Sequence, residues 1–111
     1  MNGLQAFDLD EIQARQRAAS QAYLEFLRRP GFTLGMYVVK AGASDDQTPH
    51  ATDEVYIVLR GAGTLRVEDE NTPVAAGSVV SVDRGREHRF VDVIEDLHLL
   101  VVFAAPEDAK G

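Results

Sequence analysis

The stretch Pro49–Gly63, PHATDEVYIVLRGAG, decides the fold that the rest of the chain must follow. His50 is its second residue, and Glu54 follows four residues later at the start of a run of strand-forming residues. The run ends in a Gly-x-Gly turn. An even spacing places His50 and Glu54 on one face of an extended strand. The pattern therefore predicts a β-strand over residues 54–60 with a histidine and a carboxylate on the same side.

A second stretch, GSVVSVDRGREHRFVD at residues 77–92, supplies another histidine in a similar setting. His88 opens a strand-like run directly after a tight turn at residues 83–85. Two imidazoles and one carboxylate can hold a divalent metal ion through three positions and leave others open, as a catalytic metal requires. We therefore expect the two stretches to be neighbouring walls of one small β-barrel, with His50, Glu54 and His88 pointing into it.

Three other side chains near these stretches have a different interpretation. Asp53 competes with Glu54, but its odd spacing from His50 points it to the opposite face of the strand. By the same alternation, Glu87 is a solvated charge at the rim. His98 lies in a later strand-like run. It is either a group that falls inward near the site or, as we favour, a histidine at the surface or behind the ligands.

The sequence predicts one helix over residues 8–28. Asp8 and Glu11 stand at the spacing of an N-terminal capping box, and a Pro-Gly pair follows the segment. Tyr23 and Phe26 continue an apolar stripe at helical spacing. We interpret these two aromatic residues as anchors of the helix on the outside of the barrel, rather than as a lid over a ligand.

From residue 32 onward the chain consists of short runs of β-branched and aromatic residues separated by Gly, Pro, Asn and Asp. The predicted strands cover residues 32–39, 54–60, 64–69, 73–76, 78–82, 88–93 and 98–104. Many short strands at close spacing are typical of a mostly antiparallel sandwich or barrel. Because the strand at residues 54–60 is apolar on both faces, the helix or a second subunit must cover the outer face, and we expect a homodimer.

Composition restricts the class of protein. The chain has 111 residues, which favours one domain, and a net charge of −7, which disfavours binding to nucleic acid and to anionic membrane surfaces. It has no cysteine, so disulfides and thiolate metal sites are excluded. No apolar run approaches the roughly 20 residues of a membrane helix, and the N-terminus lacks the pattern of a signal peptide. We therefore expect a cytoplasmic protein.

The two stretches resemble the paired motifs of the cupin superfamily, whose members are small jelly-roll barrels. The first motif is matched at Gly42, His50, Glu54 and Gly61, and Thr48 stands where the family has its first histidine. The second motif is matched at Gly77, Gly85 and His88, while Asp83 replaces a proline and Asp92 an asparagine. The resemblance covers residues 32–104 and extends to the short, single-domain, cupin-2-like members.

This resemblance implies an all-β jelly-roll barrel at residues 32–105. The predicted helix makes residues 1–31 an N-terminal helical extension, and we expect residues 106–111 to form a flexible tail. The resemblance also implies that His50, Glu54 and His88 bind a divalent metal such as Fe, Zn, Mn or Ni. With Thr48 in place of the first histidine, it supplies three protein ligands.

Alternation along the strands predicts which residues line the barrel. Tyr56 and Val58 share the face of Glu54, Phe90 and Asp92 share the face of His88, and either Met36 or Tyr37 faces inward. The cavity is then narrow, apolar and aromatic with a polar metal end. Such a cavity suits a small organic molecule.

The favoured function is a metal-dependent enzyme of dioxygenase, isomerase or decarboxylase type that acts on a small molecule. Tyr56 and His98 are the candidates for a separate catalytic acid or base. We interpret Arg84, Arg86 and Arg89 as solvated rim side chains rather than as a receptor for a substrate carboxylate. Two alternatives remain: a non-catalytic module that binds or senses a small ligand, and a barrel without metal that serves as a structural unit.

Overall fold

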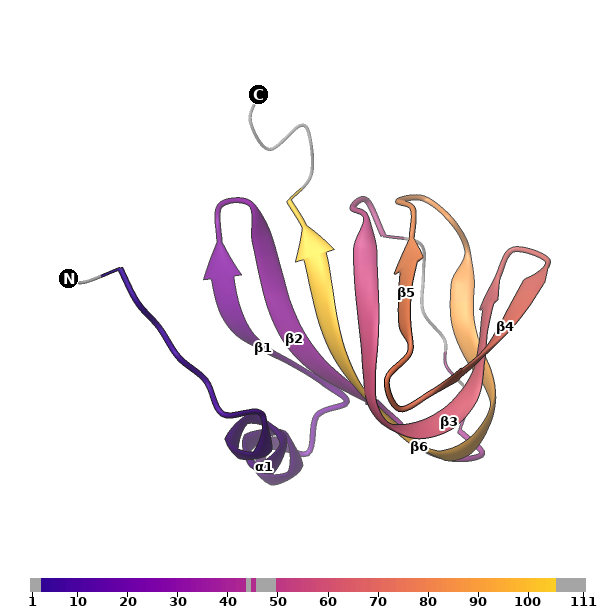
Figure 1. Cartoon of the computed structure of the whole chain (residues 1–111), viewed down its shortest axis with the longest axis horizontal. Helices are drawn as coiled ribbons and strands as arrows, with labels where there is room; N and C mark the ends of the chain where they lie inside the picture. The colour runs from indigo at the N-terminus through magenta and orange to yellow at the C-terminus, as the bar shows by residue number, and fades with distance from the viewer. Residues whose placement is uncertain (1–2, 44, 46–49, 106–111) are drawn as a thin grey trace.

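The computed structural model describes residues 3–43, 45 and 50–105. It contains one helix and six strands in these ranges: α1 (Leu9–Ala19), β1 (Tyr23–Arg29), β2 (Phe32–Val39), β3 (Glu54–Val67), β4 (Glu70–Ala75), β5 (Val79–Val82) and β6 (His88–Ala104). All strand pairs are antiparallel, in the order β1-β2-β6-β3-β4, with β5 on the free side of β3. The predicted all-β jelly-roll barrel with one N-terminal helix is confirmed (Figure 1).

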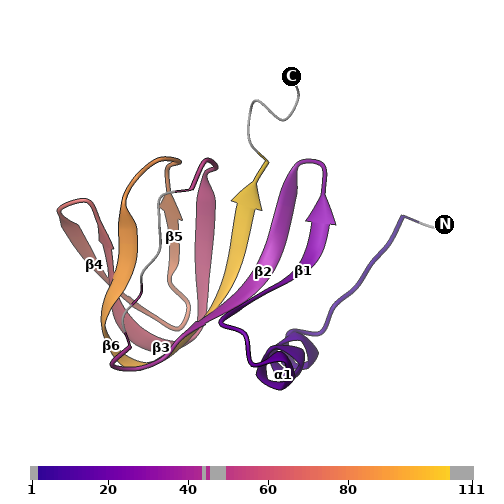
Figure 2. The same ribbon diagram turned by 180° about the vertical axis from the view of Figure 1, so that it is seen from behind.

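Two long strands, β3 and β6, run through both walls of the barrel. The first part of β3, residues 54–57, pairs with β5, and its last part, residues 62–67, pairs with β4. Between these parts the register of β3 and β6 shifts repeatedly, from Val58 to Thr64. Figures 1 and 2 show both strands bending there, so that the sheet folds back over its own inner face. Register shifts of this kind bend strands and increase their twist.

The core lies between the two walls. Its buried members come from β2 to β6 and point inward: Val39, Tyr56, Val58, Leu65, Val74, Val82, Phe90, Val93, Leu97, Leu99 and Val101. The predicted inward positions Tyr56, Val58 and Phe90 are among them. Asp92 was predicted to face inward with Phe90, and this is wrong. Asp92 has a φ of +48° and is exposed, because the bulge opposite Ala62 and Thr64 interrupts the alternation and turns Val93 inward instead.

The predicted helix over residues 8–28 is too long. Asp8 does cap the N-terminus, where its carboxylate accepts a hydrogen bond from the Asp10 amide at 2.9 Å, but the helix ends at Ala19 with Ser20 in the left-handed region at φ +56°. Residues 23–29 form β1, which pairs with β2 across a two-residue Pro-Gly turn. The i, i+3 spacing of Tyr23 and Phe26 is compatible with a helix, but tertiary pairing with β2 overrides that local preference.

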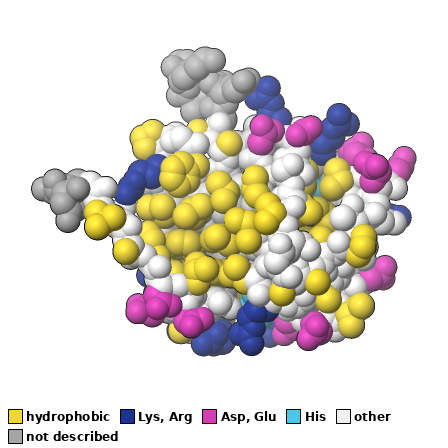
Figure 3. Space-filling view, in the orientation of Figure 1, with side chains coloured by type: hydrophobic (Ala, Val, Ile, Leu, Met, Phe, Trp, Pro, Cys, Tyr) yellow, Lys and Arg dark blue, Asp and Glu magenta, His cyan; other side chains and the backbone are white. Residues whose placement is uncertain are grey.

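The outer face of the sheet is apolar over several strands. The directly paired residues of one row are Leu24 on β1, Met36 on β2, Leu100 on β6, Ile57 on β3 and Val79 on β5. Helix α1 packs against β1 and β2 on this side, where Met36 is fully buried, whereas Val79 is 65% exposed. Figure 3 shows the resulting broad apolar area over the sheet. The helix therefore covers only part of this face.

The structure also bears on the predicted strand boundaries and on the predicted C-terminal tail. The predicted strands 54–60 and 64–69 are one strand, β3, and the predicted strands 88–93 and 98–104 are one strand, β6. The tail predicted at residues 106–111 lies outside the described residues. No helix in the described part of the chain has the length and apolar character needed to cross a bilayer.

Gly61 and Gly77 allow a matched test of the bend. Both have nearly the same backbone angle, φ +96° and +95°, but a Cβ on Gly61 would lie 2.1 Å from the Asp96 carbonyl oxygen, whereas Gly77 has nothing within 4 Å. We expect Gly77→Ala to lower the unfolding free energy by about 1–2 kcal/mol, because alanine is unfavourable at this positive φ but its Cβ meets no other atom. Gly61→Ala should cost about 3 kcal/mol or more, because β3 and β6 must also separate. Equal losses for the two variants in chemical denaturation would contradict this account of the bend.

Candidate metal centre

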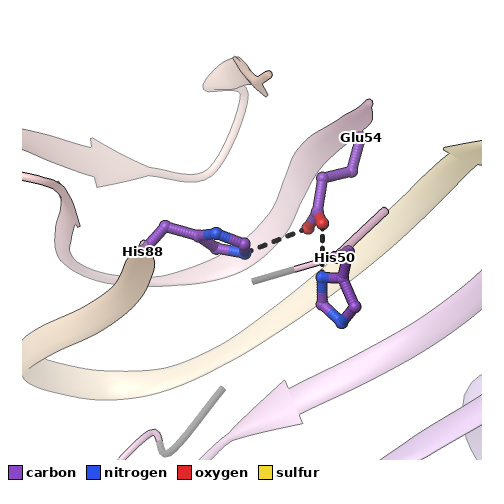
Figure 4. Close-up of side chains that lie close together, drawn as sticks. All are labelled: His50, Glu54 and His88. Carbon is purple, nitrogen blue, oxygen red and sulfur yellow. Dashed lines mark hydrogen bonds and ion pairs between the residues drawn. The ribbon is translucent and has the colours of Figure 1, made fainter. Parts of the chain in front are cut away.

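The three predicted ligands come together at one end of the barrel. Glu54 is the first residue of β3, His88 is the first residue of β6, and His50 lies four residues before β3. Each offers one ligand atom, and these atoms all lie within 4.8 Å of one another (Figure 4). His88 and Glu54 are buried, and His50 is half-buried. The sequence pattern therefore identified a real cluster drawn from two distant segments.

Two hydrogen bonds donated by backbone amides hold these segments together. The amide of Gly85, in the turn before His88, donates to the His50 carbonyl at 2.8 Å. The amide of Arg84 donates to the Asp53 carboxylate at 2.8 Å. Asp53 is exposed and faces away from the cluster, as its odd spacing predicted. Its carboxylate thus fixes the turn that positions His88.

The Glu54 carboxylate lies between the two imidazoles with its side chain only 1% exposed. Its Oε2 lies 2.6 Å from His50 Nδ1, and its Oε1 lies 3.2 Å from His88 Nε2 (Figure 4). Although Oε1 is this close to His88, no described group donates a well-aligned hydrogen bond to it. Burial alone would raise the pKa of Glu54, but the polar groups of His88 and Tyr56 and the histidine charges outweigh burial and lower that pKa.

His88 is oriented by the backbone. Its Nδ1 donates to the Arg86 carbonyl at 2.9 Å, so Nε2 is the nitrogen that faces Glu54. The Tyr56 hydroxyl lies 3.1 Å from the same Nε2. Burial would lower the pKa of His88, but the Glu54 carboxylate, 3.2 Å from Nε2, and the Arg86 carbonyl outweigh burial and raise that pKa. The two groups therefore favour each other's charged form.

A divalent cation suits this arrangement. His88 Nε2, the unbonded Glu54 Oε1 and the nearby His50 nitrogen would serve together as ligands of such an ion. The Nδ1–H of His88 on a backbone carbonyl is the support that metal-ligating histidines usually have. Thr48, which stands at the family's first histidine, lies outside the described residues. The donor set present fits a metal.

A pocket of about 430 Å³ opens beside the cluster on the inner face of the sheet. Its lining is mostly aromatic: Tyr23, Glu25, Tyr37, His50, Tyr56, Val101 and Phe103. The open choice between Met36 and Tyr37 is resolved, because Tyr37 lines the pocket while Met36 is buried on the outer side. The aromatic character predicted for the cavity is present, with the cluster at one side of it.

Tyr23 reaches the pocket from β1 because Gly35 gives it room. A Cβ on Gly35 would lie 2.2 Å from the Tyr23 ring. The Tyr23 hydroxyl is buried without a well-aligned hydrogen bond. Burial is the largest cause that raises the pKa of Tyr23, while the neighbouring Thr33 hydroxyl lowers it in part. The interpretation of Tyr23 as an outer anchor is therefore wrong, since it faces the pocket from a strand.

The remaining sequence-predicted residues lie elsewhere. Glu87, Arg84, Arg86 and Arg89 are exposed and none of them lines the pocket, which agrees with their interpretation as rim side chains. His98 belongs to a different hollow under α1 and is absent from the cluster. Of the two catalytic candidates, only Tyr56 is at the site.

Sequence reasoning missed Asp45, which was assigned only to a loop. Its buried carboxylate accepts from the Tyr37 hydroxyl at 2.6 Å and from the Phe90 amide at 2.7 Å. It thereby ties the pocket lining to the strand that carries His88. A carboxylate in a polar loop gives no sequence signal for burial.

Comparison with known proteins agrees with this structure. The family model for the cupin domain matches residues 35–103. SCO3923, an uncharacterised protein of Streptomyces coelicolor, is 48% identical over 94% of this chain and 99% of its own length. TT1209 from Thermus thermophilus matches with a TM-score of 0.76 and 24% identity over 93% of this chain and 99% of that one.

A further solved structure is more distant. The DMSP lyase DddQ from Ruegeria pomeroyi matches with a TM-score of 0.71 and 16% identity over 78% of this chain and 48% of that one. At these identities the structural matches establish the fold alone. The family match, the close relative and the shared barrel together lead to one conclusion: this chain belongs to the cupin family.

Proposed function

We propose that this cupin binds a divalent metal ion through His50, Glu54 and His88 and acts as a metal-dependent enzyme on a small organic molecule. The observation that carries the proposal is the buried Glu54 carboxylate, which lies between two imidazoles and has one oxygen without a hydrogen bond. Two histidines and a carboxylate are a donor set that suits Fe, Zn, Mn or Ni.

When bound, the metal would supply Lewis acidity or oxygen activation, which oxidation, isomerisation and decarboxylation can all use. The protein's own contribution is the aromatic pocket beside the cluster, which would orient the ligand against the metal. Tyr56 is the group placed to exchange a proton with the ligand, because its hydroxyl is buried beside His88 Nε2 and its side chain lines the pocket.

The pocket favours a small molecule of low charge. None of the described lining residues is Lys or Arg, one of them, Glu25, is acidic, and the Glu54 carboxylate lies in the cluster beside the pocket. A carboxylate group on the ligand would therefore depend on the metal for its counter-charge. A compact, partly aromatic or apolar molecule with one polar end matches the lining best.

The alternative is a non-catalytic cupin that binds or senses such a ligand. The absence of a free carboxylate base among the described lining residues favours this alternative, because the one carboxylate there, Glu25, forms an ion pair with Arg28 at 2.8 Å. Metal binding is common to both candidates, and turnover separates them.

Metal content tests the ligand set. The purified protein, loaded with Zn or with Fe(II) under anaerobic conditions, should hold one metal per chain. His88→Ala should weaken metal binding by more than about 100-fold, because it removes a ligand rather than a supporting group. His98→Ala is the matched control and should bind as tightly as the unchanged protein. Equal affinity of both variants, measured by competition with a chelator, would remove His88 from the site.

Tyr56→Phe tests catalysis apart from binding. The variant should keep the metal and the ligand affinity, while turnover of any substrate found in a screen of small organic molecules should fall about 10²- to 10⁴-fold, the usual contribution of an acid or base. Retained turnover would exclude Tyr56 as a proton-transfer group. A metal-loaded protein that binds screened molecules tightly and converts none of them would favour the binding module.

We also propose that a second copy of this chain covers the apolar outer face, as expected from the two-sided apolar character of β3. Ile57 lies in the middle of the apolar row, paired with Leu100 on one side and Val79 on the other. Contiguous apolar area of this kind on a folded protein commonly marks an interface (Figure 3).

Light scattering on two aspartate variants tests the homodimer. Ile57→Asp should convert the dimer to a monomer, since it places a charge in the centre of the buried face. Ile94→Asp is the control, because Ile94 is 78% exposed outside the apolar row and should leave the mass unchanged. A monomeric unchanged protein at micromolar concentration would contradict the proposal.

A further inference from the structure

A second hollow, of about 550 Å³, lies between α1 and the outer face of the sheet. It is lined by Gln13, Gln16 and Arg17 of α1, Ser20, Gln21 and Ala22 after it, Val38 and Lys40 at the end of β2, and Asp96 and His98 of β6. It shares no lining residue with the pocket beside the metal centre. Because His98 alternates with Leu99, whose side chain is in the core, it faces outward toward the helix.

Two buried polar atoms in this hollow lack partners. Gln13 is 8% exposed, and its Oε1 has no hydrogen bond from any described group; His98 Nδ1 is likewise buried and unpartnered. Buried polar atoms left in this state cost free energy, and in native structures they are usually paired with water or another group. Both atoms belong to residues that line the same hollow.

Gln13 is not needed to attach the helix, because Gln16 already does this. The Gln16 amide nitrogen donates to the Ala22 carbonyl at 2.5 Å and to the Met36 carbonyl at 3.1 Å, which fastens α1 to the start of β1 and to β2. The side-chain amide of Gln16 therefore has a structural role, because its N–H groups donate to these two carbonyls. Gln13, one turn earlier on the same side, has no comparable structural contact from Oε1.

The charge around the hollow is positive within an acidic chain. Arg17 and Lys40 line it and are exposed, and Asp96 is the one carboxylate in its described lining. The Asp96 carboxylate accepts a hydrogen bond from the Ala41 amide at 2.8 Å. Burial, and then the charges of Arg60, Arg17 and Lys40, lower the pKa of His98 against the opposing effect of Asp96. The lowered pKa favours the uncharged ring, in which one nitrogen donates and the other accepts a hydrogen bond.

We infer that this hollow binds a small hydroxylated carboxylate, with its hydroxyl groups hydrogen-bonded to Gln13 Oε1 and His98 Nδ1 and its carboxylate lying against Arg17 and Lys40. A hydroxyl group can donate to Gln13 Oε1 and can donate to or accept from His98 Nδ1, whichever tautomer the ring adopts. The two cations require a ligand with negative charge. A dicarboxylate without hydroxyl groups would meet only the requirement for charge. This site is separate from the metal centre and does not depend on its function.

The probes are three dicarboxylates of equal charge: succinate, L-malate and L-tartrate, which carry none, one and two hydroxyl groups. Binding is followed at the site itself, through the NMR signals of the His98 ring and the Gln13 side-chain amide. We expect affinity to rise by about tenfold with each hydroxyl group, since each one satisfies a buried polar atom. Equal affinity for the three probes, or no shift at His98 and Gln13, would overturn the inference.

Variants separate this site from the metal centre and from general charge effects. Arg17→Gln and Lys40→Gln should each weaken L-tartrate binding about fivefold, through loss of a partly screened charge. Arg15→Gln removes the same charge from the same helix but outside the hollow, and should have no effect. His88→Ala, which removes a proposed metal ligand, should leave the shifts at His98 unchanged. Shifts that disappear in His88→Ala, or a bridging water that persists at saturating tartrate in a crystal structure, would refute the site.

Discussion

The structure depends most on how the charge of one buried carboxylate is balanced. Glu54 is 2% exposed, and an isolated carboxylate at that depth would be protonated or would destabilise the fold. Two imidazoles compensate it, one from the chain just before β3 and one from the start of β6. The same requirement that stabilises the barrel therefore assembles a metal-binding donor set, and a metal would satisfy it more completely than a proton can.

The bend of β3 and β6 makes this convergence possible. Each strand passes through both walls, so the register shifts near Gly61 determine how far the sheet folds over its inner face. The turn at residues 83–85 is fixed separately, by the hydrogen bonds of its amides to His50 and Asp53. The long strands thus bring His88 to the same side of the barrel as Glu54. The hydrogen-bonded turn then fixes where the His88 backbone begins β6.

Sequence patterns predicted the parts that follow from strict alternation. The separation of Asp53 from Glu54 and the inward positions of Tyr56 and Phe90 needed only a period of two. Alternation failed at Asp92, where a bulge adds residues on one strand, and bulges have no reliable sequence signal. The helix prediction failed at β1 because the apolar spacing fits both structures, and pairing with β2 is a long-range contact. Asp45 was missed for the same reason: its burial comes from partners 8 and 45 residues away.

The paired strands β2 and β6 present residues to the pocket on the inner face of the sheet and to the hollow on its outer face. The register of this pairing decides which residues face each side. Along β2 and β6 the inward residues Tyr37 and Val101 line the metal-side pocket, while Val38 and His98 face the hollow under α1. A slip of one residue would exchange the two sets, so both sites require the same pairing. That pairing is regular from Phe32 to Val39, where β2 runs beside β6 without a bulge. The irregular geometry is confined to the bend and to β1, and this separation lets the barrel close without disturbing the strands that present its polar groups.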